Sequence, residues 1–350
     1  MEPAHRFLRA CYRLPVDQTP VWFMRQAGRY LPQYRALRKQ ANFGEMLKNP
    51  DLACEATMQP IRELDPDAAI IFSDILVPLQ AMGLHLDYAE DGPVLQPVRS
   101  PDDIGRLQPC DPDDKMPFLA KSISMVKRAL AGKVPLIGFA GAPFTLASYA
   151  VEGGGSKSYT QLKRLLFGDP AAAHLLLDKL DRAVIDTLGA QIAAGVQAVQ
   201  LFDTWASILS PRDFEEFALR HVRTVISAVR SEHGGAAARA VPIIYYVNGV
   251  APYLSSLESS GADVVGLDYR VSIAEARARL GPGIAVQGNL DPAALFLPAG
   301  ELAARTIETV LQAGARPGYI FNVGHGLLPE TDPDSVRAVI TAVRQVATSG

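Results

Sequence analysis

Cysteine is scarce in this 350-residue sequence. Only Cys11, Cys54 and Cys110 occur, an odd number with no short-range pairing pattern, whereas small secreted proteins use closely spaced, even sets of cysteines. The first residues, MEPAHRFLRACYRLPVD, carry charges and prolines where a signal peptide needs an apolar run. We therefore expect a cytoplasmic protein.

Long hydrophobic runs are also lacking. The longest uncharged run, VPLIGFAGAPFTLASYAV at 134–151, contains Pro135, Gly138, Gly141 and Pro143, which break it well short of a membrane-spanning helix. The pattern predicts a buried strand, a turn and the start of a helix. The formal net charge of −3 gives no general attraction to nucleic acid or anionic membranes, so we expect neither as a partner.

Acidic residues are missing from one long segment. No Asp or Glu occurs between Asp17 and Glu45, and within this gap the stretch PVWFMRQAGRYLPQYRALR carries four arginines, Arg25, Arg29, Arg35 and Arg38. Gly28 and Pro32 interrupt the helix that would present these arginines as a solvated face. Planar guanidinium groups bind carboxylates or phosphates through paired hydrogen bonds. The segment therefore predicts an anion-binding region.

Short apolar runs recur along the chain and alternate with longer amphipathic stretches. The runs are PVWFM at 20, AAIIF at 68, PLIGFAG at 135, AVQLF at 198, PIIYYV at 242, VVGLD at 264, IAVQG at 284 and YIFNVG at 319. Continuous apolar runs are typical of parallel strands that are covered on both faces. Eight such strand-then-helix units predict an α/β fold, a single-domain (β/α)8 TIM barrel over residues 1–350. The Gly-rich turn of a doubly wound sheet does not follow the first run.

Two segments depart from this repeat. The stretch LHLDYAEDGPVLQPV at 84–98 alternates in polarity and turns at Asp91-Gly92, which predicts a small hairpin inserted after the second strand. The run EGGGSKS at 152–158 resembles a phosphate-binding loop, but Ser156 stands where the glycine before the lysine is required. We interpret that run as a flexible loop near the mouth of the site.

Polar residues follow the predicted strands, at the end of a barrel where active sites are found. They are Arg25, Gln26 and Arg29 after the first run, Ser73 and Asp74 after the second, Tyr149 in the helix after the third, Asp203 and Thr204 after the fourth, Asn248 after the fifth, Asp268 and Tyr269 after the sixth, Asn289 after the seventh, and Asn322 and His325 after the eighth. Several have a purely structural alternative. Asp74, Asp203 and Thr204 stand where helix N-caps are expected, and Tyr149 lies on an apolar helix face that is typical of a core.

The identity of the anion can be narrowed by what the strand ends lack. Barrel phosphate sites are usually built from Gly-rich backbone after strands seven and eight, and QGNLDP and VGHGLLPE carry little of that signal. Carboxylates are therefore favoured. His325 has no neighbouring Cys or second His, so no metal site is expected. No dinucleotide fingerprint or carrier lysine stands at a strand end, so no organic cofactor is expected either.

Two long segments carry a family resemblance. PVWFMRQAGRY and GFAGAPFTLASYAVEGGGS resemble the two signature segments of the uroporphyrinogen decarboxylase family, and IFSDIL, QLFDTWAS and NVGHGLLPE fall in the family's order. The resemblance runs from about residue 5 to the C-terminus. It implies a (β/α)8 barrel, commonly a homodimer, that removes four CO₂ from the acetate side chains of uroporphyrinogen III to give coproporphyrinogen III without a metal or organic cofactor.

The resemblance also implies a set of site residues. The expected catalytic residues are Asp74, Arg25 and Tyr149, and the expected substrate-binding residues are Arg25, Gln26, Arg29, Asp74, Tyr149, Thr204 and His325. Ser207 is an alternative to Thr204, and Arg38 matches a further family arginine. In this chemistry Asp74 accepts hydrogen bonds from pyrrole N–H groups and stabilises a cationic ring. The sequence leaves the proton donor open, with Arg25 as one candidate relay.

Two alternative functions use the same fold. Zinc-dependent methyltransferases of the barrel superfamily need a constellation of His and Cys ligands, and this sequence has none at its strand ends. A non-catalytic tetrapyrrole binder is the second alternative. The presence of Asp74 together with Arg25 and Arg29 argues against it.

Overall fold

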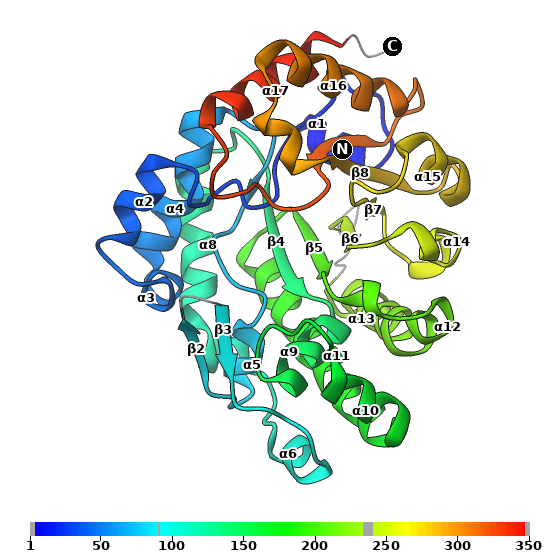
Figure 1. The fold of residues 1–350 in the computed structure, drawn as a ribbon. Helices are drawn as coiled ribbons and strands as arrows, with labels where there is room; N and C mark the ends of the chain where they lie inside the picture. The colour runs from blue at the N-terminus through cyan, green and yellow to red at the C-terminus, as the bar shows by residue number, and fades with distance from the viewer. Residues whose placement is uncertain (1–3, 90–91, 234–240, 347–350) are drawn as a thin grey trace.

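A curled sheet of parallel strands forms the centre of the computed structural model, which describes residues 4–89, 92–233 and 241–346 (Figure 1). Its seven strands follow the order β1-β4-β5-β6-β7-β8-β9, and each pairs in parallel with its neighbours. The strands are β1 (Ala69–Ile70), β4 (Leu136–Gly141), β5 (Ala198–Asp203), β6 (Ile243–Val247), β7 (Val264–Gly266), β8 (Ala285–Leu290) and β9 (Tyr319–Val323).

The segment at 20–24 joins the two edges of this sheet. Val21 forms a single parallel bridge with Phe321 of β9. On the other side, the Asp67 amide, just before β1, donates to the Val21 carbonyl at 2.7 Å. The barrel architecture predicted from the sequence is therefore confirmed. The prediction of a regular first strand was wrong, and the predicted second strand at 68–72 is reduced to the two residues of β1.

Side-chain acceptors explain why the first strand is irregular. Three of its buried amides donate to side-chain oxygens instead of a neighbouring strand, in the pairs Val21 N to Asp67 Oδ2 at 2.9 Å, Phe23 N to Gln26 Oε1 at 3.2 Å and Met24 N to Asn322 Oδ1 at 3.0 Å. Buried amides need a partner, but the partner need not be a strand. The chain is thus free to turn outward at Arg25, whose φ of 61° lies in the left-handed region.

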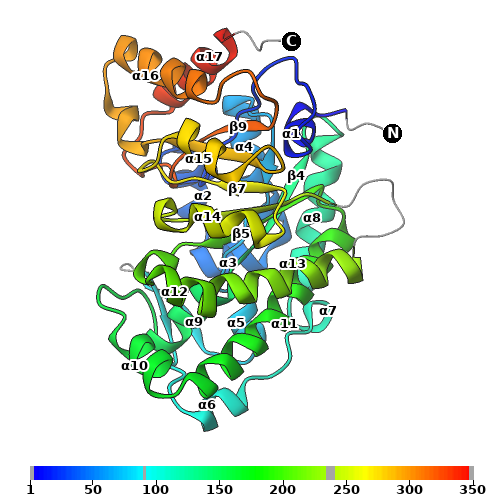
Figure 2. The same cartoon turned by 90° about the vertical axis from the view of Figure 1, so that its right-hand side faces the viewer.

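Helices surround the sheet (Figure 2). The longer ones are α4 (Pro50–Leu64), α8 (Pro117–Leu130), α9 (Pro143–Glu152), α10 (Thr160–Gly168), α11 (Pro170–Ala194), α13 (Arg220–His233), α15 (Ile273–Leu280), α16 (Ala299–Gln312) and α17 (Pro333–Gln345). Many start with Pro at the first position behind an Asp, Asn or Ser cap. In α11, for example, Asp169 accepts from the Ala172 amide at 3.0 Å.

Short helices fill the connections. They are α1 (Arg6–Cys11), α2 (Pro32–Arg38), α3 (Phe43–Lys48), α5 (Val77–Ala81), α6 (Pro101–Arg106), α7 (Pro112–Lys115), α12 (Pro211–Phe214) and α14 (Leu254–Leu257), with the 3₁₀ turns η1 (Ala206–Ile208), η3 (Ala251–Tyr253), η4 (Glu258–Ser260) and η5 (Pro292–Phe296) and the π turn η2 (Glu215–Leu219). Within the described ranges, none of the helices has both the length and the apolar character needed to cross a membrane.

The barrel interior is a packed core. Phe7 and Cys11 of α1 belong to one buried cluster with Trp22 and with inward-facing strand residues such as Ile320. A polar chain crosses the same interior, since Trp22 Nε1 donates to Gln287 Oε1 at 2.9 Å, and Gln287 in turn bonds to Gln200. Because α1 and these side chains fill the barrel interior, a ligand is expected at the carboxyl ends of the strands, where barrel active sites lie.

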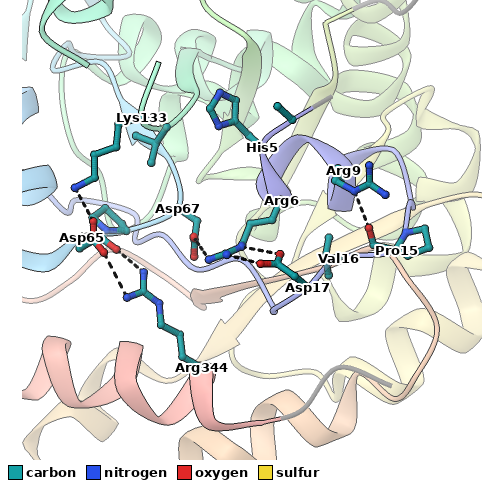
Figure 3. Close-up of a pocket in the computed structure, with 13 residues that line it drawn as sticks. His5, Arg6, Arg9, Pro15, Val16, Asp17, Asp65, Asp67, Lys133 and Arg344 are labelled. Carbon is teal, nitrogen blue, oxygen red and sulfur yellow. Dashed lines mark hydrogen bonds and ion pairs between the residues drawn. The ribbon is translucent and has the colours of Figure 1, made fainter. Parts of the chain in front are cut away.

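A cavity of about 650 Å³ lies at the amino-terminal end of the strands (Figure 3). Its charged groups are already paired with one another. Arg6 bonds to Asp67 at 2.9 Å and to Asp17 at 2.6 Å, and Lys133 bonds to Asp65 at 2.7 Å. At this end of a barrel, such networks stabilise the scaffold.

The predicted hairpin is present. It consists of β2 (Leu86–Ala89) and β3 (Gly92–Leu95), paired antiparallel; the predicted turn at Asp91-Gly92 falls partly on residues 90–91, which lie outside the described residues. β3 also anchors the loop after α9. Val94 bridges Gly154, and the Leu95 amide donates to the Gly153 carbonyl at 3.0 Å. The hairpin thereby holds the carboxyl end of the helix that carries Tyr149.

Barrel closure through Asp67 predicts a specific stability loss. Asp67→Ala leaves the buried Val21 amide without its acceptor, so the free energy of unfolding should fall by about 1–3 kcal/mol. Asp17→Ala removes the exposed partner of the same Arg6 and should cost less than about 1 kcal/mol. Urea denaturation of both variants measures the difference. Equal losses would show that the Asp67–Val21 contact does not close the barrel.

Candidate active site

Arg25 lies at the carboxyl-end mouth of the barrel. Its aliphatic stem packs against Gly326 in the loop after β9, where even a methyl group would collide with it. That loop is held in place by the Leu327 amide, which donates to the Met24 carbonyl at 3.0 Å. In the described part of the chain, the side chains of Arg25 and Arg29 form no hydrogen bond and no ion pair. Both guanidinium groups are exposed and available to an anion.

The other two arginines of the segment serve the local fold. Arg35 Nη1 donates to the carbonyls of Arg29 and Tyr30 at 2.8 and 2.9 Å. Arg38 donates to the Ala41 carbonyl at 3.2 Å, and its guanidinium lies 5.8 Å from the centre of the Phe43 ring. Of the four arginines in the acid-free segment, two therefore stabilise the local backbone, and two have guanidinium groups that are available to a ligand. The role of Arg38 as a site arginine stays a prediction.

Asp74 follows β1 and is half-buried. Its Oδ1 accepts from the Leu76 amide at 2.8 Å. Burial raises the pKa of this carboxyl, while the Leu76 amide, the Tyr88 hydroxyl and the charge of Arg25 oppose that rise. Leu76 occupies the cap position of α5, which begins at Val77, so Asp74 caps the turn before that helix and not the helix itself. Asp74 is thus a weakly compensated negative charge beside an unpaired guanidinium.

Tyr88 of the hairpin lies close to Asp74 and was not singled out by the sequence analysis. Its ring packs edge-on against Phe43, with centroids 4.8 Å apart. Its hydroxyl is buried and lies close to the Asp74 carboxyl. Burial and the nearby charge of Asp74 both raise the pKa of Tyr88. The alternating pattern of LHLDY placed one hairpin face inward, but only the tertiary fold shows that this face meets Asp74.

Tyr149 projects from α9 toward the same region. Its ring contacts Trp205 edge-on, with centroids 5.9 Å apart. Burial raises the pKa of Tyr149, and the charge of Asp74 adds to the rise, whereas Trp205 and Arg25 oppose it. The phenol is therefore protonated at neutral pH and can donate a hydrogen bond. Trp205, which the sequence analysis did not single out, fixes the orientation of this ring.

His325 lies half-buried in the loop after β9. Burial, followed by the positive charges of Arg25 and Arg270, lowers the pKa of His325 to about 4, and Asp268 opposes the shift only in part. The imidazole is neutral at neutral pH and acts as a hydrogen-bonding group, not as a cationic acid. The charge of Arg25 shifts the pKa of His325, Asp74 and Tyr149 alike. The structure therefore gathers these predicted residues around one guanidinium.

Gln26 is placed differently from the rest of the predicted set. It is only 1% exposed. Its amide nitrogen donates to the Ala68 carbonyl at 3.1 Å, while its oxygen accepts from Phe23. These bonds join the irregular first strand to β1, so the side chain supports the scaffold beneath Arg25. Its role as a substrate contact stays a prediction.

The sequence analysis expects a substrate-binding hydroxyl group at Thr204 or, alternatively, at Ser207. Thr204 is half-buried, and its carbonyl accepts from Asn248 Nδ2 at 3.2 Å. Ser207 is exposed and packs closely on Gly249. No contact in the structure tests either side chain as a ligand group, and both remain predictions.

Two buried acids at the strand ends support the site from below. Asp203 accepts from Thr145 Oγ1 and from the Tyr245 hydroxyl, both at 2.7 Å, and burial raises the pKa of Asp203 to about 6. Asp268 accepts from Arg270 Nε at 2.8 Å. It thereby holds a further cation near His325 that the sequence analysis did not identify.

The cavities of the surface do not by themselves locate this site. One of about 660 Å³ lies between the loops after β7 and β8 and helix α16, and it includes Arg270. Neither that cavity nor the one in Figure 3 is lined by Arg25, Asp74 or Tyr149. The convergence of unpaired arginine side chains and a half-buried acid at the strand ends makes this mouth the candidate site, because chemistry depends on such groups.

Comparisons with known proteins show the family of the chain. The family model described as uroporphyrinogen decarboxylase (URO-D) matches residues 2–346. The chain belongs to the uroporphyrinogen decarboxylase family. It is 49% identical over 341 residues to uroporphyrinogen decarboxylase of Chloroflexus aurantiacus, covering 97% of this chain and 95% of that protein. The match to uroporphyrinogen decarboxylase of Myxococcus xanthus is 50% over 341 residues, covering 97% and 96%.

Membership of this family confirms the function expected from the sequence, the decarboxylation of uroporphyrinogen in tetrapyrrole biosynthesis. A solved methyltransferase from Methanosarcina mazei has a similar fold, with a TM-score of 0.78 at 21% identity and 97% of each chain covered. At that identity the likeness shows the barrel fold alone. It gives no support to the methyltransferase alternative.

The lowered pKa of His325 predicts a pH-dependent stability difference. The unfolded chain takes up a proton at His325 near pH 6.5, whereas the folded chain does so only near pH 4. Stability is therefore lost as the pH falls through this interval. His325→Gln removes that titration, so its free energy of unfolding should fall less between pH 7 and pH 5 than that of the wild type. Parallel urea denaturation curves give the comparison, and an NMR titration that placed His325 above pH 6 would contradict it.

Proposed function

We propose that this site converts uroporphyrinogen III to coproporphyrinogen III by removing the carboxyl groups of four acetate side chains. One observation carries the proposal. The unpaired guanidinium of Arg25 lies close to the half-buried carboxylate of Asp74, and the exposed guanidinium of Arg29 follows four residues later. A substrate with eight carboxylates and four pyrrole N–H groups requires this combination of free cations with one central acceptor.

The chemistry follows from the substrate. A proton adds to the ring carbon next to the one that carries the acetate and turns the pyrrole into an iminium-like cation. The bond between the methylene and the carboxylate then breaks, CO₂ leaves, and the electron pair neutralises the ring. The methylene carbon takes up a proton and the ring carbon releases one, which leaves a methyl group. Each cycle consumes one proton and releases one CO₂, and the pyrrole itself is the electron sink.

Asp74 is proposed to stabilise the cationic ring. Burial already disfavours its charge, as the raised pKa indicates, so a cation that develops beside it relieves that cost. This interaction is stronger in the transition state than with neutral substrate, which is the requirement for faster turnover. The pyrrole N–H groups donate to the same carboxylate and hold the macrocycle over it.

The remaining groups are proposed to hold the substrate's carboxylates. Arg25 and Arg29 pair with acetate or propionate groups, and the protonated phenol of Tyr149 and the neutral imidazole of His325 add hydrogen bonds. Arg25 lies near Asp74 and the reacting ring, so it also remains the candidate proton relay. We also propose that the protein is a homodimer in the cytoplasm, as expected from the family resemblance. Sedimentation of the purified chain tests the dimer.

Incubation with uroporphyrinogen III, followed by product chromatography, tests the proposal as a whole. The four-carboxylate product should accumulate through intermediates with seven, six and five carboxylates. Unchanged substrate in the presence of folded protein would leave only a tetrapyrrole-binding role.

The role of Asp74 predicts separate effects on turnover and stability. Asp74→Asn keeps the shape of the side chain but removes its charge, so kcat should fall on the order of 10²–10⁴. Because the raised pKa marks ionised Asp74 as a cost to folding, the melting temperature should stay equal or rise. Asp87→Asn, an exposed acid on the hairpin, serves as the control and should keep wild-type turnover. Near-normal kcat in Asp74→Asn, or activity lost only in step with unfolding, would reduce Asp74 to a structural residue.

The free guanidinium groups predict that replacing Arg29 lowers kcat/KM. In Arg29→Lys an ammonium cannot reproduce bidentate pairing with a carboxylate, so kcat/KM should fall about tenfold or more, equivalent to about 1.4 kcal/mol. Arg35→Lys is the matched control, because Arg35 bonds to backbone carbonyls in the same segment. It should retain kcat/KM even if its stability falls. Wild-type kinetics in Arg29→Lys would remove Arg29 from the site.

A further inference from the structure

A second cluster of ionisable groups lies outside the barrel mouth, where α11 and α13 run side by side in the outer layer (Figure 2). His174, Asp178 and Asp181 of α11 are spaced four and three residues apart, so they share one helix face. That face meets His221 of α13. His221 Nδ1 lies 2.8 Å from Asp181 Oδ2 and 3.8 Å from Asp178 Oδ1.

The three groups Asp178, Asp181 and His221 have the geometry of metal ligands. One ligand atom from each lies within 4.8 Å of the others. Two carboxylates and a neutral imidazole suit a divalent transition-metal cation, since nitrogen and oxygen ligands together are typical of zinc and its neighbours. The cluster is open on one side, because the Asp178 side chain is 67% exposed. Water can enter there and complete the coordination.

An unpaired buried oxygen points to a missing ligand. Asp181 is 4% exposed, and its Oδ1 has no hydrogen-bond partner in the described ranges. Burial raises the pKa of Asp181, and the charge of Asp178 adds to that rise, although His221 opposes it. A cation between the two carboxylates would satisfy the free oxygen and remove their mutual repulsion.

His174 holds His221 in the orientation that a ligand requires. His174 Nδ1 lies 3.2 Å from His221 Nε2, and the two rings stack with centroids 5.5 Å apart. His174 is itself fixed by stacking on Phe217, with centroids 5.1 Å apart. A ligating histidine usually donates its second ring N–H to such a partner. With a cation on Nδ1, the His221 proton resides on Nε2 and is donated to His174 Nδ1.

We propose that Asp178, Asp181 and His221 bind one divalent transition-metal cation of the zinc type, which ties α11 to α13. The ion is structural, because its ligands lie on the outer helices and not among the residues gathered around Arg25. The proposed metal site is separate from the decarboxylation, and the two proposals are tested independently.

Zinc titration of the chelator-treated full-length protein by isothermal calorimetry tests the site. The wild type should bind about one equivalent per chain, and zinc should raise its melting temperature, because an ion that binds only the folded state stabilises it. Asp181→Asn and Asp178→Asn should each weaken binding about tenfold or more, since each removes a charged ligand. Asp178→Asn keeps the buried Asp181–His221 pair and decides the matter if Asp181→Asn does not fold.

Asp102→Asn, an exposed aspartate of α6, is the matched control and should bind zinc as the wild type does. Decarboxylation should be unchanged after chelation and in Asp178→Asn, which separates this site from the active site. The proposal is overturned if the wild type shows no saturable zinc binding, or if Asp178→Asn binds zinc as tightly as Asp102→Asn.

Discussion

The structure depends on how the barrel closes without a regular first strand. Asp67, Gln26 and Asn322 accept the amides that a strand would otherwise pair, so both sheet edges are joined through Val21. Because side-chain acceptors replace the hydrogen bonds of a neighbouring strand, the chain can leave the barrel directly after Met24. Arg25 is the first residue beyond it, and the closing loop after β9 supports its stem. Closure and ligand binding are thus built from the same few residues.

The barrel mouth carries charges that the protein does not neutralise internally. Among the described residues the Arg25 guanidinium has no hydrogen-bond or ion-pair partner, whereas the half-buried Asp74 accepts from the Leu76 amide. Such uncompensated charges are unfavourable for folding. They favour a polyanionic ligand that becomes cationic at its centre, because both charges are compensated only when that ligand is bound. Asp203, a buried acid below the mouth, accepts a hydroxyl hydrogen bond on each of its two oxygens and forms part of the scaffold. The open guanidinium groups, and not the buried acids, therefore distinguish the candidate site from its scaffold.

Much of this could be predicted from the sequence, because the signals are local. Continuous apolar runs predicted the strands, and alternation predicted the hairpin. The missing acids around Arg25 and Arg29 predicted an anion site. The irregular first strand could not be predicted, because an acceptor of its amides comes from Asn322, nearly 300 residues away. Tyr88 and Arg270 escaped notice for the same reason, since only the tertiary fold brings the hairpin and the loop after β7 to the mouth.

A crystal structure of the chain with bound coproporphyrinogen III tests the central claim most directly. The account predicts that the pyrrole N–H groups lie within about 3 Å of the Asp74 carboxylate. It also predicts that Arg25 and Arg29 each pair with a carboxylate of the macrocycle. A macrocycle whose nitrogens face away from Asp74, or whose carboxylates are held by other cations, would contradict the assignment of the site and of its electrostatic centre.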